Sequence, residues 1–109
     1  MDYRVDFDAA EWEPTLDGTA RLKRVVRGST IFRLVELTPE TRHPHWCVVG
    51  HVGMIAEGEV EVEFNDKTLV LRKGDALCIP AGERDRHRPR ALTERAVMFL
   101  IENAEPSDV

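Results

Sequence analysis

The chain has 109 residues, of which 42% are hydrophobic and 32% charged, a globular rather than a disordered composition. Its net charge of −5 argues against a general nucleic-acid binder, and no apolar run approaches the roughly 20 residues that span a bilayer. The start of the chain lacks the apolar stretch of a signal peptide, so we expect a cytoplasmic protein that forms one domain over residues 1–109.

Short apolar and alternating segments predict strands along the chain, and no segment gives a convincing helix. The alternation at Tyr3–Phe7 predicts a short N-terminal strand. The further strands that we expect lie at Ala20–Arg27, Thr30–Leu37, Glu57–Asn65, Thr68–Arg72, Ala76–Ile79 and Arg95–Glu102. Turn residues such as Gly28-Ser29 and Asn65-Asp66 separate them. This pattern predicts an all-β sandwich or barrel.

The clearest periodicity lies at Glu57–Asn65. Four glutamates occupy every second position there, and Val60, Val62 and Phe64 fall on the opposite face. We interpret the acidic row as a solvated outer surface. On the returning strand we expect Leu69 and Leu71 to point inward.

All four histidines, His43, His45, His51 and His87, lie in one stretch of the chain. Residues two apart in a strand point the same way, about 6.6 Å apart. His43 and His45 can therefore face one centre from one strand, and Asp85 and His87 can do so from another. His51 would enter from the adjoining strand. Imidazole and carboxylate are suitable ligands for Zn²⁺, Fe²⁺, Ni²⁺, Mn²⁺ or Co²⁺.

Other chemically interesting residues have simpler interpretations. We expect Cys47 and Cys78 to be two buried thiols, and Cys47 is an alternative metal ligand. The alternating run Arg84, Arg86 and Arg88 is interpreted as a solvated basic strip that balances the glutamates, with anion binding as the alternative. Arg42, beside the histidines, is a candidate for steering an anionic ligand.

The histidine stretch resembles the first motif of the cupin superfamily through His43-Pro44-His45, His51 and Gly58. Gly74, Pro80 and Gly82 resemble the second motif. The resemblance covers about residues 35–100 and is nearest to small single-domain bacterial cupins with the pattern His45-Trp46-Cys47 and Gly50-His51. It implies a single-domain cupin jelly roll, an RmlC-like double-stranded β-helix, and a homodimer.

Three features depart from the family pattern. Five residues separate His45 from His51, one more than the usual maximum, so we expect a small bulge there. His51 stands where the first motif usually has its glutamate, and Asp85 stands where the second motif has its histidine. The mixed nitrogen and oxygen set is nevertheless kept, so we expect a divalent transition metal held by His45, His51 and His87, with His43 and Asp85 as candidates for a fourth place.

The leading hypothesis is therefore a small metal-binding cupin that binds or transforms a small organic molecule, anionic in one version, inside the barrel. The departures motivate an alternative, a non-catalytic ligand sensor or structural barrel with a degenerate metal site. A third interpretation, a subunit-interaction protein, predicts that His45→Ala and His87→Ala leave function intact.

Overall fold

The computed structural model describes residues 3–15, 18–41 and 45–103, and it is built almost wholly from strands. In chain order the elements are η1 (Phe7–Ala9), β1 (Glu13–Pro14), β2 (Arg21–Arg27), β3 (Thr30–Leu37), β4 (His51–Glu57), β5 (Glu59–Glu63), β6 (Thr68–Arg72), β7 (Ala76–Ile79), η2 (Glu83–Asp85), β8 (Arg88–Ala91) and β9 (Ala96–Asn103). Within the described ranges, no helix has the length and apolar character needed to cross a bilayer.

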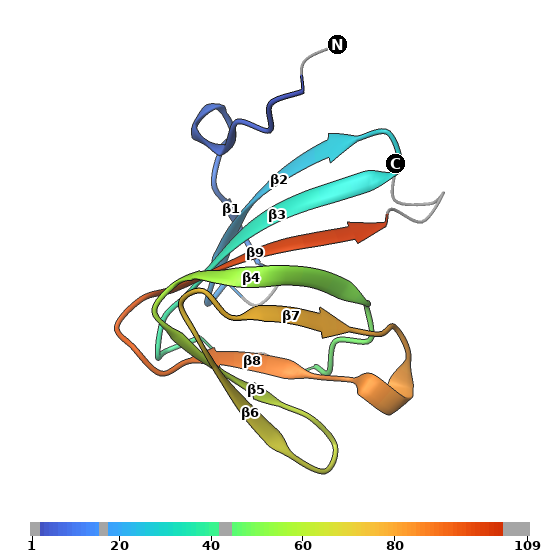
Figure 1. Cartoon of the computed structure of the whole chain (residues 1–109). Coiled ribbons are helices and arrows are strands. Elements are labelled where there is room, and N and C mark those ends of the chain that lie inside the picture. The colour runs from blue at the N-terminus through green and yellow to red at the C-terminus, as the bar shows by residue number, and fades with distance from the viewer. Residues whose placement is uncertain (1–2, 16–17, 42–44, 104–109) are drawn as a thin grey trace.

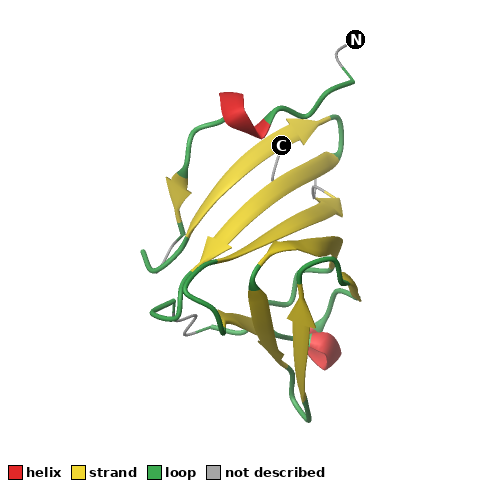
Figure 2. Ribbon diagram, turned by 60° about the vertical axis from the view of Figure 1, so that its left-hand side comes forward, coloured by secondary structure: helices red, strands yellow, loops and turns green. Residues whose placement is uncertain are grey.

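The strands form two antiparallel sheets (Figure 1). The larger sheet has the order β1-β2-β3-β9-β4-β7, and the smaller sheet has the order β6-β5-β8. The two short 3-10 helices lie at opposite ends of the molecule (Figure 2). Side chains from the facing sides of both sheets form one buried cluster, which includes Leu37, Ile55, Val60, Ala91 and Met98. The predicted all-β architecture is confirmed.

Strand β9 is apolar on both faces because both of its faces are covered. Its neighbours are β3 and β4, and Met98 and Leu100 enter the core between the sheets. On the outer face, the Phe99 ring packs edge-on against Phe7 of η1 and stacks on Phe32 of β3. This double cover explains the nearly continuous apolar run that the sequence shows.

The alternation in β5 gives the burial that it predicts. Val60 and Val62 are buried, and the glutamates between them face outward. Arg90 and Arg88 of β8 lie opposite Glu61 and Glu63 and form ion pairs with them. The interpretation of two balancing charged rows is thereby confirmed for these residues, and both pairs are exposed, so each adds little stability.

Gly58 makes the sharp connection between β4 and β5 possible. Its φ is +74°, and a Cβ at this position would lie 2.3 Å from the Arg95 carbonyl oxygen. Glycine alone combines the positive φ with so close an approach. The turn sends the chain from the larger sheet into the smaller one, so that the two sheets can face each other across the core.

Several predictions of local structure are wrong, and two of them concern Tyr3–Phe7 and Asp85. Tyr3–Phe7 forms no strand: Tyr3 is 90% exposed, and Phe7 begins η1, for which the Asp6 carboxylate accepts a hydrogen bond from the Asp8 amide. Asp85 lies not in a strand but at the end of η2, which follows Gly82 with its φ of +119°. Aspartate competes well for local backbone hydrogen bonds, which favours caps and turns over a short strand.

Candidate functional site

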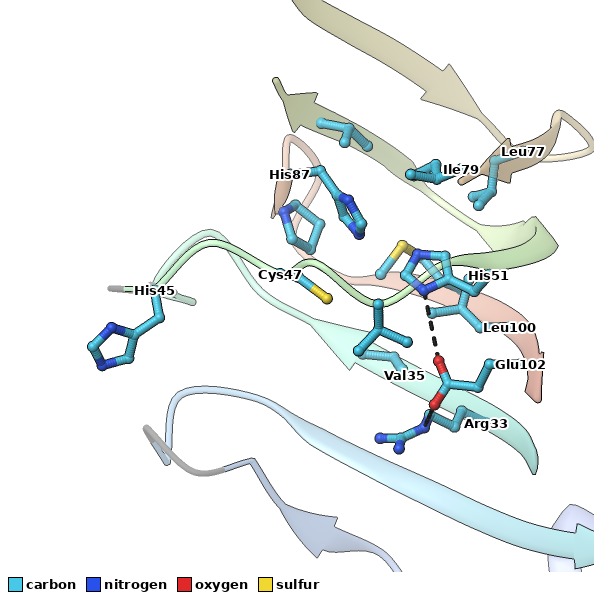
Figure 3. A pocket seen from close by; sticks show the side chains of 14 residues that line it. Arg33, Val35, His45, Cys47, His51, Leu77, Ile79, His87, Leu100 and Glu102 are labelled. Carbon is cyan, nitrogen blue, oxygen red and sulfur yellow. Dashed lines mark ion pairs between the residues drawn. The ribbon is translucent and has the colours of Figure 1, made fainter. Parts of the chain in front are cut away.

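A cavity of about 240 Å³ lies between the two sheets and is called here the inner cavity. Its apolar wall comes mainly from the larger sheet, with Val35, Leu77, Ile79, Met98 and Leu100. Its polar lining consists of Arg33, His45, Cys47, His51, His87 and Glu102 (Figure 3). Three histidines thus line one space, and the rings of His51 and His87 meet there although they come from distant parts of the chain.

Strand register explains why these polar groups converge. Val35 pairs with Met98 and Arg33 with Leu100, so these four side chains share the inner face of the larger sheet. Glu102 lies two residues beyond Leu100 and therefore also points inward. Val52 of β4 pairs with Ile101, and the same register brings His51 opposite Glu102.

Glu102 connects Arg33 to His51 at one end of the cavity. Its side chain is 8% exposed and forms an ion pair with the Arg33 Nε through one oxygen. The other oxygen lies 3.6 Å from His51 Nδ1. Burial raises the pKa of Glu102, but the contact with His51 and the charge of Arg33 outweigh it and leave the pKa below its usual value. The carboxylate is thus held in its ionised form.

His87 is buried, and its ring orientation is fixed by the backbone. Its Nδ1 lies 3.0 Å from the Asp85 carbonyl oxygen, which can only accept, so Nδ1 carries a proton. The ring meets that of His51 edge-on, with 4.9 Å between the centroids. Among the described residues, neither His87 Nε2 nor His51 Nδ1 has a hydrogen-bond partner of good geometry, although both atoms are buried.

Cys47 lies beside His87 because the two residues form an isolated β-bridge with two backbone hydrogen bonds of 2.9 and 3.0 Å. The contact with the His87 imidazole lowers the pKa of the Cys47 thiol in spite of its partial burial. Burial lowers the pKa of His87, but Cys47 and the Asp85 carbonyl outweigh this, and the net shift is upward. The expectation of two buried thiols is wrong, because Cys47 is half-buried and Cys78 is exposed.

The other predicted site residues lie apart from this pair of imidazoles. His45 is exposed at the rim of the cavity, and its ring points away from His51 and His87 (Figure 3). Asp85 contributes its carbonyl to His87, and it lines a different cavity, near Phe64. His43 and Arg42 fall outside the described residues.

The donor set does not fit a metal ion as it stands. In the described part of the chain, no three side chains of His, Cys, Asp or Glu are arranged to hold one. His51 and His87 are close together, but the nearest carboxylate, Glu102, is engaged by Arg33. Structural and catalytic zinc sites use at least three protein ligands. His51 and His87 are therefore one ligand short of such a site among the described residues.

Sequence reasoning missed Arg33 and Glu102. Both stand in largely apolar strands, Thr30–Leu37 and Ala96–Asn103. A charged residue within such a strand is the feature of the sequence that indicates a functional or paired group. Charged residues on the buried face of a central strand are almost always paired. Their partner could not be found without the register of β3 against β9.

Comparison with known proteins agrees with the fold. The chain is similar to protein NMB1881 from Neisseria meningitidis, with 26% identity, a TM-score of 0.62, and coverage of 76% of this chain and 81% of that one. It is also similar to an RmlC-like cupin with a double-stranded β-helix fold from Methanocaldococcus jannaschii, with 14% identity, a TM-score of 0.67, and coverage of 89% and 92%.

A third similar structure is the iron(II) form of HppE, with 16% identity and a TM-score of 0.72. The match covers 90% of this chain but 58% of HppE, so the chain spans little more than half of that protein. No curated protein matches the chain. The family described as "Cupin domain" matches residues 33–102, which include the whole smaller sheet, most of the larger sheet apart from β1 and β2, and all residues that line the inner cavity, and the chain therefore belongs to the cupin family.

Proposed function

We propose that this cupin binds a small organic molecule in the inner cavity. The observation that carries the proposal is the pair of buried ring nitrogens, His51 Nδ1 and His87 Nε2, which have no well-formed hydrogen bond within the described ranges. A buried polar atom without a partner costs about 1–3 kcal/mol. We infer that a bound molecule supplies the missing hydrogen-bond partner.

The size and lining of the cavity support the same proposal. An apolar cavity of roughly 150 Å³ accommodates benzene, and the inner cavity measures about 240 Å³. Aliphatic side chains make up most of its wall, while His87, His51, Glu102 and Arg33 follow one another across it (Figure 3). A few polar groups on an apolar wall are typical of sites that orient a small ligand.

Filling the cavity tests the proposal. Val35→Phe replaces a small side chain of the cavity wall by an aromatic ring. We expect this variant to bind benzyl alcohol at least about tenfold more weakly, because the ligand and the new ring compete for the same space. Binding is measured by the change in melting temperature and by NMR shifts of the His51 and His87 rings.

Leu34→Phe is the matched control, since Leu34 lies on the opposite face of the same strand. It should leave the affinity for benzyl alcohol unchanged. If benzyl alcohol leaves the histidine signals of the wild-type protein unshifted, or if the two variants bind it equally well, the proposal is wrong.

Divalent-metal binding is the second candidate, and the orientation of His87 favours it. In metal sites a histidine commonly donates its second ring N–H to a carbonyl or carboxylate, as His87 does to Asp85. A metal would need a third donor besides His51 and His87. Of the residues predicted from the sequence, His43 lies outside the described ranges and could supply it. HppE, named as an iron(II) form, is similar in fold.

Elemental analysis of untagged protein separates the two candidates. A metal centre predicts about one ion per chain, and both His43→Ala and His87→Ala should remove it. The leading proposal predicts far less than one ion per chain, no gain on incubation with Zn²⁺ or Fe²⁺, and unchanged benzyl alcohol binding in His43→Ala.

A homodimer and a cytoplasmic location remain part of the proposal. The outer face of the larger sheet supports the dimer, because Val52 and Met54 of β4 are 45% and 43% exposed there. Apolar side chains grouped on a sheet face favour association. Light scattering should give twice the mass of one chain.

A further inference from the structure

A second hollow adjoins the inner cavity at the end where β9 terminates, and we name it the outer recess. It measures about 670 Å³. Arg33, His51 and Glu102 line both spaces and so form a shared wall between them. The remaining polar side chains of the outer recess are Arg24 and Asn103.

Arg24 of β2 is placed directly opposite Arg33 of β3 in the antiparallel register. Like charges on directly opposed residues destabilise a sheet unless something neutralises them. Arg33 has its counter-charge in Glu102. Arg24 has no ion pair or hydrogen bond with any described side chain, and it is exposed on the recess. With histidine counted as neutral, the recess therefore carries one positive charge in excess.

Apolar side chains complete the recess. Ile31 and Ile79 lie within it, and both are buried. Val48 and Val49 border it and are 40% and 47% exposed. Two guanidinium groups beside such a surface present a charged end and an apolar end to one bound molecule. A guanidinium group binds planar oxyanions through two parallel N–H donors.

We propose that the outer recess binds a small organic anion, whose acidic group lies between Arg24 and Arg33 and whose apolar part lies against Val48 and Val49. This site is distinct from the inner cavity of the proposed function, although Arg33, His51 and Glu102 line both spaces. The single excess charge favours a carboxylate, and a phosphorylated compound is the other source of a suitable oxyanion.

Benzoate and benzyl alcohol test the inference, since the two molecules are similar in size and differ in charge. We expect benzoate to bind the wild-type protein more tightly than benzyl alcohol does. Arg24→Gln should weaken benzoate about tenfold, the loss of one charge-assisted contact, and leave benzyl alcohol unchanged. The weakening should shrink at high salt, because salt screens exposed charges.

Arg27→Gln is the matched control. It removes the same charge from the same strand, but Arg27 contacts the Val26 and Arg4 carbonyl oxygens rather than the recess. It should leave benzoate binding unchanged. Phenyl phosphate forms a third arm, and tighter binding of phenyl phosphate than of benzoate, lost in Arg24→Gln, would keep the anion site but assign it to phosphorylated ligands.

The outcomes separate the two proposals. If benzyl alcohol binds and Arg24→Gln leaves benzoate binding unchanged, the anion site is wrong and the proposed function stands. If Arg24→Gln and Arg27→Gln weaken benzoate equally, the effect reflects net charge alone and the anion site is again wrong. If neither probe binds the wild-type protein, both proposals fail.

Discussion

Replacing Glu102 by glutamine is expected to lower the free energy of unfolding by about 2 kcal/mol. The substitution keeps the shape of the side chain but removes the charge that faces Arg33 and His51. Removing one partner of a buried ion pair costs about 3–5 kcal/mol, and the 29% exposure of the Arg33 side chain reduces that figure. Urea unfolding of both proteins at pH 7 measures the difference.

The pH dependence of this effect has a definite sign. The pKa of Glu102 is lower in the folded protein than in the unfolded chain, so its stabilisation is fully present above the unfolded pKa and is lost as the pH falls through the folded pKa. The difference in stability between the wild type and Glu102→Gln should therefore shrink in acid. A difference that stays constant down to acid pH would show that the charge of Glu102 contributes nothing.

An exposed ion pair provides the control. Glu61→Gln breaks the pair of Glu61 with Arg90, whose side chains are 31% and 49% exposed, and should cost less than about 1 kcal/mol. The double variant Arg33→Met with Glu102→Leu should recover most of the stability lost in Glu102→Gln, because no charge then remains buried. An equal loss in Glu61→Gln and Glu102→Gln would contradict the assignment of a buried pair.

The fold could be predicted from the sequence because its strands carry local signals. Thr30–Leu37 and Ala76–Ile79 are strands at the predicted bounds, and alternation identifies the wet and buried faces of β5. The N-terminal segment has the same alternation but forms no strand. Alternation reports a tendency to bury one face, and it becomes a strand only where a neighbouring strand is available for pairing.

The site could be predicted only in part, because its polar wall depends on register between strands far apart in the chain. His51 and His87 meet as the clustering of histidines suggested. Arg33 and Glu102 come together because β3 lies beside β9, a pairing of residues about seventy positions apart. His45 and Asp85 were expected to lie in strands, but neither does. The rule that residues two apart point the same way holds only within a strand, so it does not predict where their side chains point.

Strand β6 shows that the direction of a side chain can be predicted from the sequence while its burial cannot. Leu69 and Leu71 pair with Val62 and Val60, so both face the core side of the smaller sheet, as the alternation predicts. Leu71 is 8% exposed, whereas Leu69 is 45% exposed. Leu69 stands one residue from the end of β6 that joins the β5–β6 turn, and that turn extends away from the larger sheet (Figure 1). Facing the core side and being buried are therefore separate properties.

This difference predicts unequal effects of the same truncation. Leu71→Ala is expected to lower the free energy of unfolding by about 2–3 kcal/mol, because it removes buried methyl groups and leaves a cavity. Leu69→Ala is expected to cost less than about 1 kcal/mol, because its side chain is already half in water. Urea unfolding measures both losses. An unchanged dependence of the free energy of unfolding on urea concentration would show that the two variants unfold in the same way as the wild type. Equal losses in the two variants would mean that the hairpin tip is covered in solution, as it would be if a second chain packed against it.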